Sequence, residues 1–171
     1  MSVIQPKKVY SCDSVLIEDE SQYEHVIYVK KEDGALFDKC NNFAAGYDLF
    51  AMEDVLIQAH SAGELKHGVA FSTRNMENYE GMFFLLSGRS SANKRCLLVF
   101  QGIIDIDYQG ILTTRCFNLT NEAILIKKGM AISQLVLVNN MNRKFYFKLV
   151  DEFPNKTERG DKGFGSSGNN V

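Results

Sequence analysis

Two carboxylates flanked by apolar residues suggest chemistry near the middle of the 171-residue chain. Asp105 and Asp107 lie two residues apart, between Ile104 and Tyr108. In an extended strand both carboxylates point to one face, and two acids on one face are unfavourable in a core. The pair therefore predicts a metal site, a proton-transfer site or a solvated edge, with a polar hairpin as the simplest alternative.

A second group of polar residues suits a phosphate group. Arg89, Ser90 and Ser91 follow the apolar run 82–86, and a short helix is expected at 90–95 with Ser90 or Ser91 as its cap. A guanidinium and hydroxyls beside a helix N-terminus can bind an anion. An ordinary helix cap with a surface arginine is the alternative.

Single polar residues interrupt two further apolar stretches. Asp48 lies in the stretch 43–49, and Gln134 lies in the stretch 129–135. A carboxylate in apolar surroundings is costly unless it is paired, so we expect a partner for Asp48. For Gln134 the alternative is a structural role, as an amide whose hydrogen bonds are satisfied in the core or at a sheet edge.

The C-terminal segment 151–171 has no apolar run with which to form a core. Its glycines allow the backbone to approach an anion closely, Arg159 suits a phosphate, and Phe164 offers a ring for stacking. The pattern GxGxxG at 163–168 is not a dinucleotide-binding fingerprint, because no βαβ unit follows it. The segment is therefore predicted to be either a solvated tail or a mobile functional arm.

Short apolar runs broken by turn residues predict the elements that position these groups. From residue 26 onward such runs recur at the interval typical of a sandwich or barrel, and no 3.6-residue period persists for three turns. We therefore expect an all-β domain over 25–150, an N-terminal extension of uncertain order over 1–24, and the arm 151–171. The expected strands are 25–30, 55–57, 68–73, 82–87, 96–100, 110–117, 123–126, 132–138 and 144–150.

Composition limits the classes of partner and compartment. The chain has 19 Lys and Arg against 21 Asp and Glu, so direct nucleic-acid binding on a basic face is not expected. Four cysteines without CxxC spacing and only three histidines argue against a zinc module and indicate reduced thiols. Neither a signal peptide nor an apolar run of about 18 residues is visible, which predicts an intracellular protein, cytoplasmic or nuclear, without a membrane partner.

Together and in order, these segments resemble the five motifs of the trimeric dUTPase family. The first motif is similar to 45–49, the second to 88–91, the third closely to 102–110, the fourth to 132–135 and the fifth to 159–168. The resemblance implies a jelly-roll-like β-barrel or sandwich and a homotrimer with shared active sites, in which the arm of one subunit closes a site between others. It also implies hydrolysis of dUTP to dUMP and pyrophosphate with Mg²⁺, which limits uracil incorporation into DNA and supplies dUMP for dTMP synthesis.

The resemblance implies roles for individual residues as well. Asp105 is expected to be the base that activates a water molecule for attack at the α-phosphorus, and Asp48 is expected to contact Mg²⁺ through water. A hairpin around 100–104 is expected to select uracil through its backbone, with Tyr108 against the deoxyribose and Phe164 over the base. The expected substrate-binding residues are Arg89, Ser90, Ser91, Gly102, Ile103, Ile104, Tyr108, Gln134, Arg159, Phe164, Gly165, Ser166 and Ser167.

Some positions depart from the family pattern, and two alternative functions are therefore considered. Met130 and Ala131 replace an acidic residue and an arginine, and Lys162 stands where the family usually has glycine. The changed fourth motif and the N-terminal extension motivate a first alternative, a non-catalytic dUTP-binding regulator that acts through a protein partner. A dCTP deaminase or bifunctional relative is the second alternative, against which the Asp-Ile-Asp-Tyr run at 105–108 argues.

Overall fold

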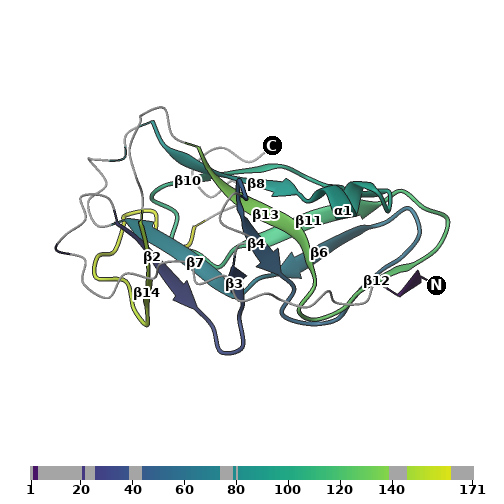
Figure 1. Cartoon of the computed structure of the whole chain (residues 1–171), viewed down its shortest axis with the longest axis horizontal. Coiled ribbons are helices and arrows are strands. Elements are labelled where there is room, and N and C mark those ends of the chain that lie inside the picture. Colours follow the sequence, from purple (N-terminus) through teal and green to yellow (C-terminus); the bar gives the residue numbers. More distant parts are fainter. Residues whose placement is uncertain are drawn as a thin grey trace.

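The computed structural model describes residues 2–3, 21, 26–38, 44–73, 79, 81–138 and 146–162, which fold mainly into β-strands (Figure 1). The strands form several small sheets packed in a jelly-roll-like arrangement, so the predicted all-β class is confirmed. The expected short helix is present as α1 (Ser90–Asn93). Among the residues listed above, no helix is long and apolar enough to cross a membrane.

The strand bounds follow the expected apolar runs closely in most places. In chain order the strands are β1 (Ser2–Val3), β2 (Val26–Lys31), β3 (Phe37–Asp38), β4 (Tyr47–Phe50), β5 (Val55–Ile57), β6 (Ala62–Lys66), β7 (Val69–Thr73), β8 (Phe83–Gly88), β9 (Leu97–Val99), β10 (Gly102–Asp105), β11 (Thr113–Asn118), β12 (Ile124–Ile126), β13 (Ala131–Val138) and β14 (Tyr146–Val150).

One five-stranded sheet carries most of the candidate site residues. Its order is β10-β8-β13-β4-β3, with antiparallel neighbours. The register places Gln134 opposite Asp48 on one side and opposite Ser87 on the other. Asp105 lies opposite Phe83, at the other end of β8. Three-stranded sheets of order β6-β11-β9, β14-β2-β7 and β1-β12-β5 complete the described fold.

Alternating burial along the strands builds the core between the sheets. On β8, Phe84 and Leu86 point inward, whereas their neighbours are only partly buried. Aromatic rings from five strands, β3, β4, β7, β8 and β14, pack together in this core. Phe37 stacks on Tyr47 with ring centroids 4.4 Å apart, and Phe147 lies 4.5 Å from Tyr47. These contacts fix the C-terminal strand β14 against β3 and β4 of its own chain.

A buried polar chain crosses the core beside the fourth motif. The Nδ1 of His67 lies 2.9 Å from the carbonyl oxygen of Phe50, and its Nε2 lies 2.7 Å from Oγ1 of Thr114. A carbonyl can only accept, so Nδ1 carries the proton and Nε2 accepts from the Thr114 hydroxyl. Thr114 Oγ1, at 2.7 Å, then accepts from the hydroxyl of Ser133. The three side chains are fully buried, and burial lowers the pKa of His67 to about 4.

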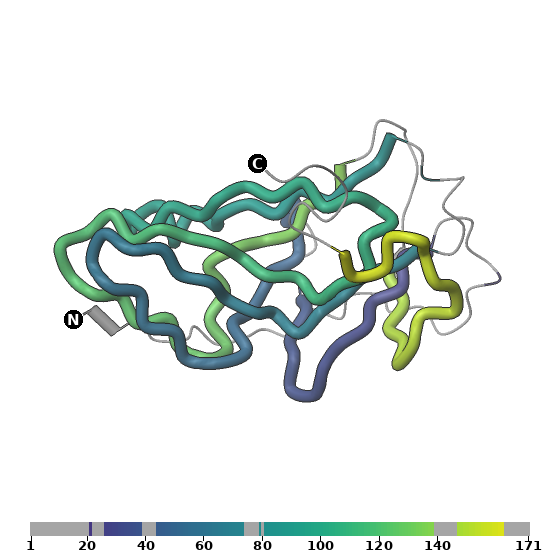
Figure 2. Tube along the Cα trace, turned by 180° about the vertical axis from the view of Figure 1, so that it is seen from behind, coloured from purple at the N-terminus to yellow at the C-terminus, as the bar shows by residue number. Residues whose placement is uncertain are grey.

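Both ends of the described chain are paired with the barrel. Ser2–Val3, within the expected N-terminal extension, lies parallel to β12. Strand β14 lies parallel to β2, and Lys30 of β2 binds Glu152 at 2.9 Å, just after β14. Seen from behind, the C-terminal segment 146–162 (yellow) lies at the same end of the molecule as β2 (Figure 2). The first part of the expected arm, 151–162, therefore packs against the domain.

Candidate active site

Asp48 and Arg89 form an ion pair at one end of the five-stranded sheet. The Arg89 Nε lies 3.0 Å from Asp48 Oδ1, and the Asp48 side chain is only 12% exposed. The partner expected for a carboxylate in an apolar stretch is therefore Arg89. Burial is the largest effect on Asp48 and raises its pKa, while Arg89 lowers it and the carboxylate of Asp38 raises it further. Asp38 lies opposite Asp48 in the β3–β4 pair.

A β-bulge on β13 aims two consecutive carbonyls at Arg89. The β13–β4 register shifts between Ala131 and Ser133. Arg89 Nη1 donates to the Ala131 carbonyl at 3.2 Å, and its backbone N–H donates to the Ile132 carbonyl at 2.9 Å. A bulge is a common way to redirect backbone groups next to a functional site. Because the acceptor is a backbone carbonyl, the alanine at 131 does not weaken this contact.

The second and fourth motifs meet at this same end of the sheet. The amide of Gln134 donates to the Gly88 carbonyl at 3.4 Å, so Gln134 lies next to the residue that precedes Arg89. Ser90 and Ser91 are exposed at the start of α1. The prediction that one of these serines caps the helix was wrong: the N-cap is Arg89, without a side-chain cap hydrogen bond. Neither hydroxyl is therefore used as a helix cap.

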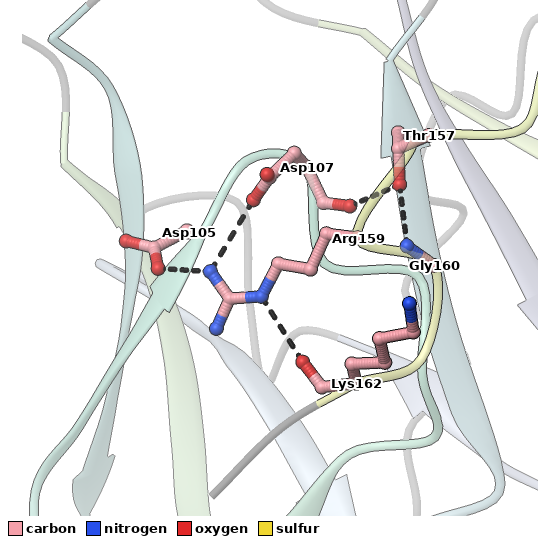
Figure 3. Close-up of polar contacts among 6 residues, drawn as sticks. All are labelled: Asp105, Asp107, Thr157, Arg159, Gly160 and Lys162. Carbon is pink, nitrogen blue, oxygen red and sulfur yellow. Dashed lines mark hydrogen bonds and ion pairs between the residues drawn. The ribbon is translucent and has the colours of Figure 1, made fainter. Parts of the chain in front are cut away.

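Asp105 and Asp107 meet a single guanidinium at the other end of the sheet (Figure 3). Arg159 Nη1 donates to Asp105 Oδ2 and lies 3.4 Å from Asp107 Oδ1. Strand β10 ends at Asp105 and a turn follows, because Tyr108 N–H bonds the Asp105 carbonyl. The two acids therefore do not lie on one extended strand, since only Asp105 belongs to β10. The hydrogen bond that Arg159 donates to Asp105 is the largest effect on the pKa of Arg159, and it raises that pKa.

Gln109 and Thr157 join the fifth motif to the third. The Gln109 amide donates to Ser72 Oγ at 2.7 Å and to the Asn155 carbonyl at 2.9 Å, and its oxygen accepts from Thr157 N–H at 3.0 Å. The Thr157 hydroxyl donates to the Asp107 carbonyl at 2.5 Å and accepts from Gly160 N–H at 2.9 Å (Figure 3). We call this set of contacts the Gln109–Thr157 clasp. Neither residue was predicted from the sequence as a site residue, although Gln109 lies within the third motif.

Tyr108 follows the two acids in the chain and directly precedes Gln109 of the clasp. Its ring is half-buried, and Arg159 Cζ lies 5.6 Å from the ring centroid. Burial, and then the Asp161 carboxylate, raise the pKa of Tyr108, which keeps the phenol neutral. A Cβ on Gly110 would overlap the Tyr108 hydroxyl, so a glycine is needed there for the ring to lie where it does. The ring is thus a fixed neutral surface beside Arg159.

Strand β10 lies at the edge of its sheet and presents Ile103 outward. Among the described strands its partner is β8 alone, so alternate backbone groups of β10 are not used by a neighbouring strand. Ile103 is 68% exposed, and Ile104 packs against the core. The hairpin expected around 100–104 does not pair with itself, because β9 bonds β11 and β10 bonds β8. The chain instead crosses between two sheets at Phe100 and Gln101.

The strand register places the residues around Arg89 far from the residues around Asp105 within one chain. Arg89 follows the last residue of β8, and Asp105 lies opposite its first residue, Phe83. Six residues of extended strand span about 20 Å at roughly 3.3 Å per residue. Figure 1 accordingly shows α1 and β14 toward opposite ends of the long axis. Asp48, Arg89 and Gln134 thus form one partial site, and Asp105, Tyr108 and Arg159 form another.

Four of the expected substrate-binding residues, Phe164, Gly165, Ser166 and Ser167, lie outside the described residues. In the part of the chain that is described, three or more His, Cys, Asp or Glu side chains do not converge in a way that could hold a metal ion.

Comparison with known proteins identifies the relatives of this chain. The family described as dUTPase matches residues 32–168. The deoxyuridine 5'-triphosphate nucleotidohydrolase of Candida albicans is 33% identical over 152 residues, covering 88% of this chain and 92% of the relative. That of Clostridium kluyveri is 37% identical over 126 residues, covering 72% and 83%. Among solved structures, the dUTPase of Staphylococcus bacteriophage 80alpha with dUPNHPP is 29% identical, with a TM-score of 0.59, and 83% of this chain and 98% of that chain are covered.

Proposed function

The chain belongs to the dUTPase family and is a dUTP diphosphatase, and we propose that Asp105 is the group that activates the attacking water. The observation that carries this proposal is the position of Asp105 at the exposed end of β10, where it pairs with the charged Arg159, whose guanidinium also lies over the neutral Tyr108 ring. A carboxylate that is 56% exposed can accept a proton from water at neutral pH. Of the two acids, only Asp105 lies on β10, the strand whose outer backbone groups are not used by a neighbouring strand.

The triphosphate needs positive charge and hydrogen-bond donors. We assign this role to Arg89 and Arg159, with Ser90, Ser91 and the Gln134 amide as neutral donors. Guanidinium groups suit this task because their planar N–H groups match phosphate oxygens and stay charged at all relevant pH values. Ser166 and Ser167 join this set by resemblance to the fifth motif. Arg89 binds Asp48 and Arg159 binds Asp105 in this structure, so a phosphate group must compete with these carboxylates for the two arginines.

The described residues fit a magnesium ion held mainly by substrate. Mg²⁺ keeps several waters and prefers phosphate oxygens, so it needs no protein cage. Asp48 would hold it through water, and the neighbouring Asp38 carboxylate adds negative charge on the same side. When bound, the ion neutralises phosphate charge and orients the chain of phosphates. Arg89 then holds the phosphate oxygens, and Asp105 takes the proton from water.

Selection of uracil and deoxyribose follows from β10 and Tyr108. The free edge of β10, over Gly102, Ile103 and Ile104, offers backbone donors and acceptors in a fixed order. A base that does not match them leaves a polar group unpaired, which is costly when it is buried. The Tyr108 ring would lie against the sugar and exclude a 2′-hydroxyl. Phe164 and Gly165, by resemblance, would cover the base.

A complete site requires more than one copy of the chain. Arg89 and Asp105 lie about 20 Å apart along β8, too far to act on one phosphate group. We propose a homotrimer in which the Arg89 end of one copy meets the Asp105 end of another, as in the closed symmetric assemblies that most oligomers adopt. Exposed Phe100 and Leu98, next to β10, supply apolar surface for such a contact. Mass measurement in solution tests the copy number.

Pyrophosphate release tests the function itself. We expect release from dUTP to exceed that from dTTP, dCTP and UTP at equal concentration. Ammonia release from dCTP would instead support the deaminase alternative. Tight dUTP binding without turnover would support the regulatory alternative, which the names of the relatives do not favour.

A further inference from the structure

One buried series of polar side chains links strands β4 and β13 at the bulge that holds Arg89. The strand register shifts on β13 between Ala131, which lies opposite Phe50 of β4, and Ser133. His67 Nδ1 donates to the Phe50 carbonyl at 2.9 Å, so the series begins on β4 at one side of the shift. It ends at Ser133 on β13, at the other side of the shift. We name this series the buried His67 chain, and its members are His67, Thr114 and Ser133.

The hydrogen bonds of the buried His67 chain run in a fixed order. Burial lowers the pKa of His67 to about 4, so at neutral pH the ring is neutral and its Nε2 accepts from the Thr114 hydroxyl at 2.7 Å. The Thr114 oxygen in turn accepts from the Ser133 hydroxyl at 2.7 Å. All three side chains are fully buried, so a group that loses its partner cannot bind bulk water instead. Each member therefore constrains the position of the next.

Two contacts carry the position of the bulge to Arg89. The Ile132 carbonyl accepts from the Arg89 backbone N–H at 2.9 Å, and the Ala131 carbonyl accepts from Arg89 Nη1 at 3.2 Å. Ser133 also lies opposite Gly88, the residue before Arg89, in the β13–β8 pair. Because the extra residue of a bulge lies outside the regular ladder, the ladder alone does not fix the direction of its carbonyl. The buried His67 chain supplies a further constraint at this point.

We infer that His67 and Thr114 are positioning residues that hold Arg89 in place for phosphate through the bulge on β13. They act through the carbonyls of Ala131 and Ile132 and do not themselves touch substrate. Both lie outside the five motifs, so the resemblance assigns them no role. The inference rests on the proposed function, because it requires Arg89 to bind the phosphate groups of dUTP.

Removing the central hydroxyl tests the inference. Thr114→Val keeps the branched shape of the side chain but leaves His67 Nε2 and the Ser133 hydroxyl without partners. KM for dUTP should rise by about fivefold or more, with a smaller fall in kcat, because Arg89 is held less well for phosphate. Where Thr114→Val does not fold, Ser133→Ala removes only the last donor and should raise KM in the same direction.

Thr113→Val is the matched control, since it makes the same substitution one residue away on β11. The Thr113 hydroxyl has no hydrogen-bond partner among the described residues. KM of this control should stay within about twofold of the wild-type value. A rise in KM equal to that of Thr114→Val would overturn the inference, because loss of either buried hydroxyl would then have the same effect.

A double-mutant cycle shows whether the effect passes through Arg89. In an Arg89→Ala background, Thr114→Val should change KM by less than about twofold, because the group that it positions is gone. An equal rise in KM with and without Arg89 would overturn the inference and leave the proposed function intact. If Arg89→Ala itself leaves KM unchanged, the proposed phosphate-binding role of Arg89 fails instead.

Conservative replacement of His67 separates its hydrogen bonds from its bulk. His67→Gln offers one donor for the Phe50 carbonyl and one acceptor for Thr114, so KM should stay near the wild-type value. His67→Leu fills the space without either group and should raise KM as Thr114→Val does. An equal rise in KM in both variants would contradict the positioning role of these hydrogen bonds.

Amide hydrogen exchange tests the bulge without any substrate. The Arg89 amide donates to the Ile132 carbonyl, and the Tyr108 amide donates to the Asp105 carbonyl at the other end of β8. In Thr114→Val or Ser133→Ala, exchange at Arg89 should accelerate by about tenfold or more, while exchange at Tyr108 stays unchanged. Unchanged exchange at Arg89 in a folded variant would overturn the inference, whatever the activity toward dUTP.

Discussion

Arg159 and Asp105, separated by 54 residues in sequence, form an ion pair within one chain. The guanidinium also lies 3.4 Å from Asp107, so one cation bridges both acids of the third motif. This pair holds the proposed phosphate-binding group beside the proposed base. In the proposed mechanism, phosphate binding exchanges one anionic partner of Arg159 for another and leaves Asp105 available to water.

Replacing Arg159 separates its charge from its geometry. Arg159→Ala should lower kcat/KM for dUTP by about 10²-fold or more, the effect typical of losing one donor to developing phosphate charge. Arg159→Lys keeps the charge but loses the planar fork, so its activity should fall between those of the wild type and Arg159→Ala. Steady-state pyrophosphate release measures both. Equal activity of the lysine variant and the wild type would show that the fork geometry is unimportant.

Removing Arg89 should make stability more dependent on pH. Burial raises the pKa of Asp48 and Arg89 lowers it, so Arg89→Ala should raise that pKa further. A carboxyl whose folded pKa is raised stabilises the protein at low pH, and this contribution is lost as pH rises from about 4 through the folded pKa. Urea denaturation should therefore show a steeper loss of stability with rising pH in Arg89→Ala. The double variant with Asp48→Asn should lose this extra slope, and a persistent slope would rule out Asp48 as its source.

The titration of His67 should make the free energy of unfolding rise with rising pH, which is opposite to the effect of Asp48. Its folded pKa of about 4 lies below its ordinary value of 6.5, so the unfolded chain binds the extra proton first. The free energy of unfolding should therefore fall as pH is lowered from 6.5 to about 4, by about 3 kcal/mol in total. His67→Gln can keep the bonds to Phe50 and Thr114 without titrating, and it should lack this component. Exposed His60→Gln is the control, and an equal loss of slope in that variant would contradict the assignment.

Tyr108 should determine the preference for deoxyribose. Tyr108→Ala opens the space beside the sugar, so the ratio of kcat/KM for dUTP to that for UTP should fall by about tenfold or more. Tyr108→Phe keeps the ring and loses only a weak 3.4 Å bond to the Ile111 carbonyl, so it should keep the ratio. Competition between the two nucleotides measures this directly. An unchanged ratio in Tyr108→Ala would assign sugar selection elsewhere.

Local apolar pattern predicted most of the strands that have a buried face, although it missed Tyr47–Phe50, in which three residues are buried. Val55–Ile57 is confirmed as expected, and the run at 132–138 becomes Ala131–Val138. Strand Ala62–Lys66 was missed because Leu65 is its only fully buried side chain. The strand expected from Gly110 begins instead at Thr113, because the chain first turns around the Tyr108 ring. Where few side chains of a strand are buried, or where a turn precedes it, strand pairing and turn geometry rather than local apolar pattern determine its existence and bounds.

The residues of both groups could be selected from the sequence, but their pairings could not. The need of Asp48 for a partner follows from its apolar neighbours, yet only the sheet register identifies Arg89. Gln109 and Thr157 lie 48 residues apart, and neither interrupts an apolar run, so local pattern gives no signal of their contact. The distance between Arg89 and Asp105 follows from the pairing of β10 with β8, which the local sequence pattern does not indicate.

Hydrolysis of dUTP in ¹⁸O-labelled water tests the central claim that Asp105 directs water to the α-phosphorus. The label should appear in dUMP and not in pyrophosphate. Asp105→Asn should lower the labelling rate by about 10²–10⁴-fold, the usual contribution of a general base. Asp107→Asn, which removes the other carboxylate near Arg159, should lower it far less. Label in pyrophosphate, or an undiminished rate in Asp105→Asn, would contradict the account.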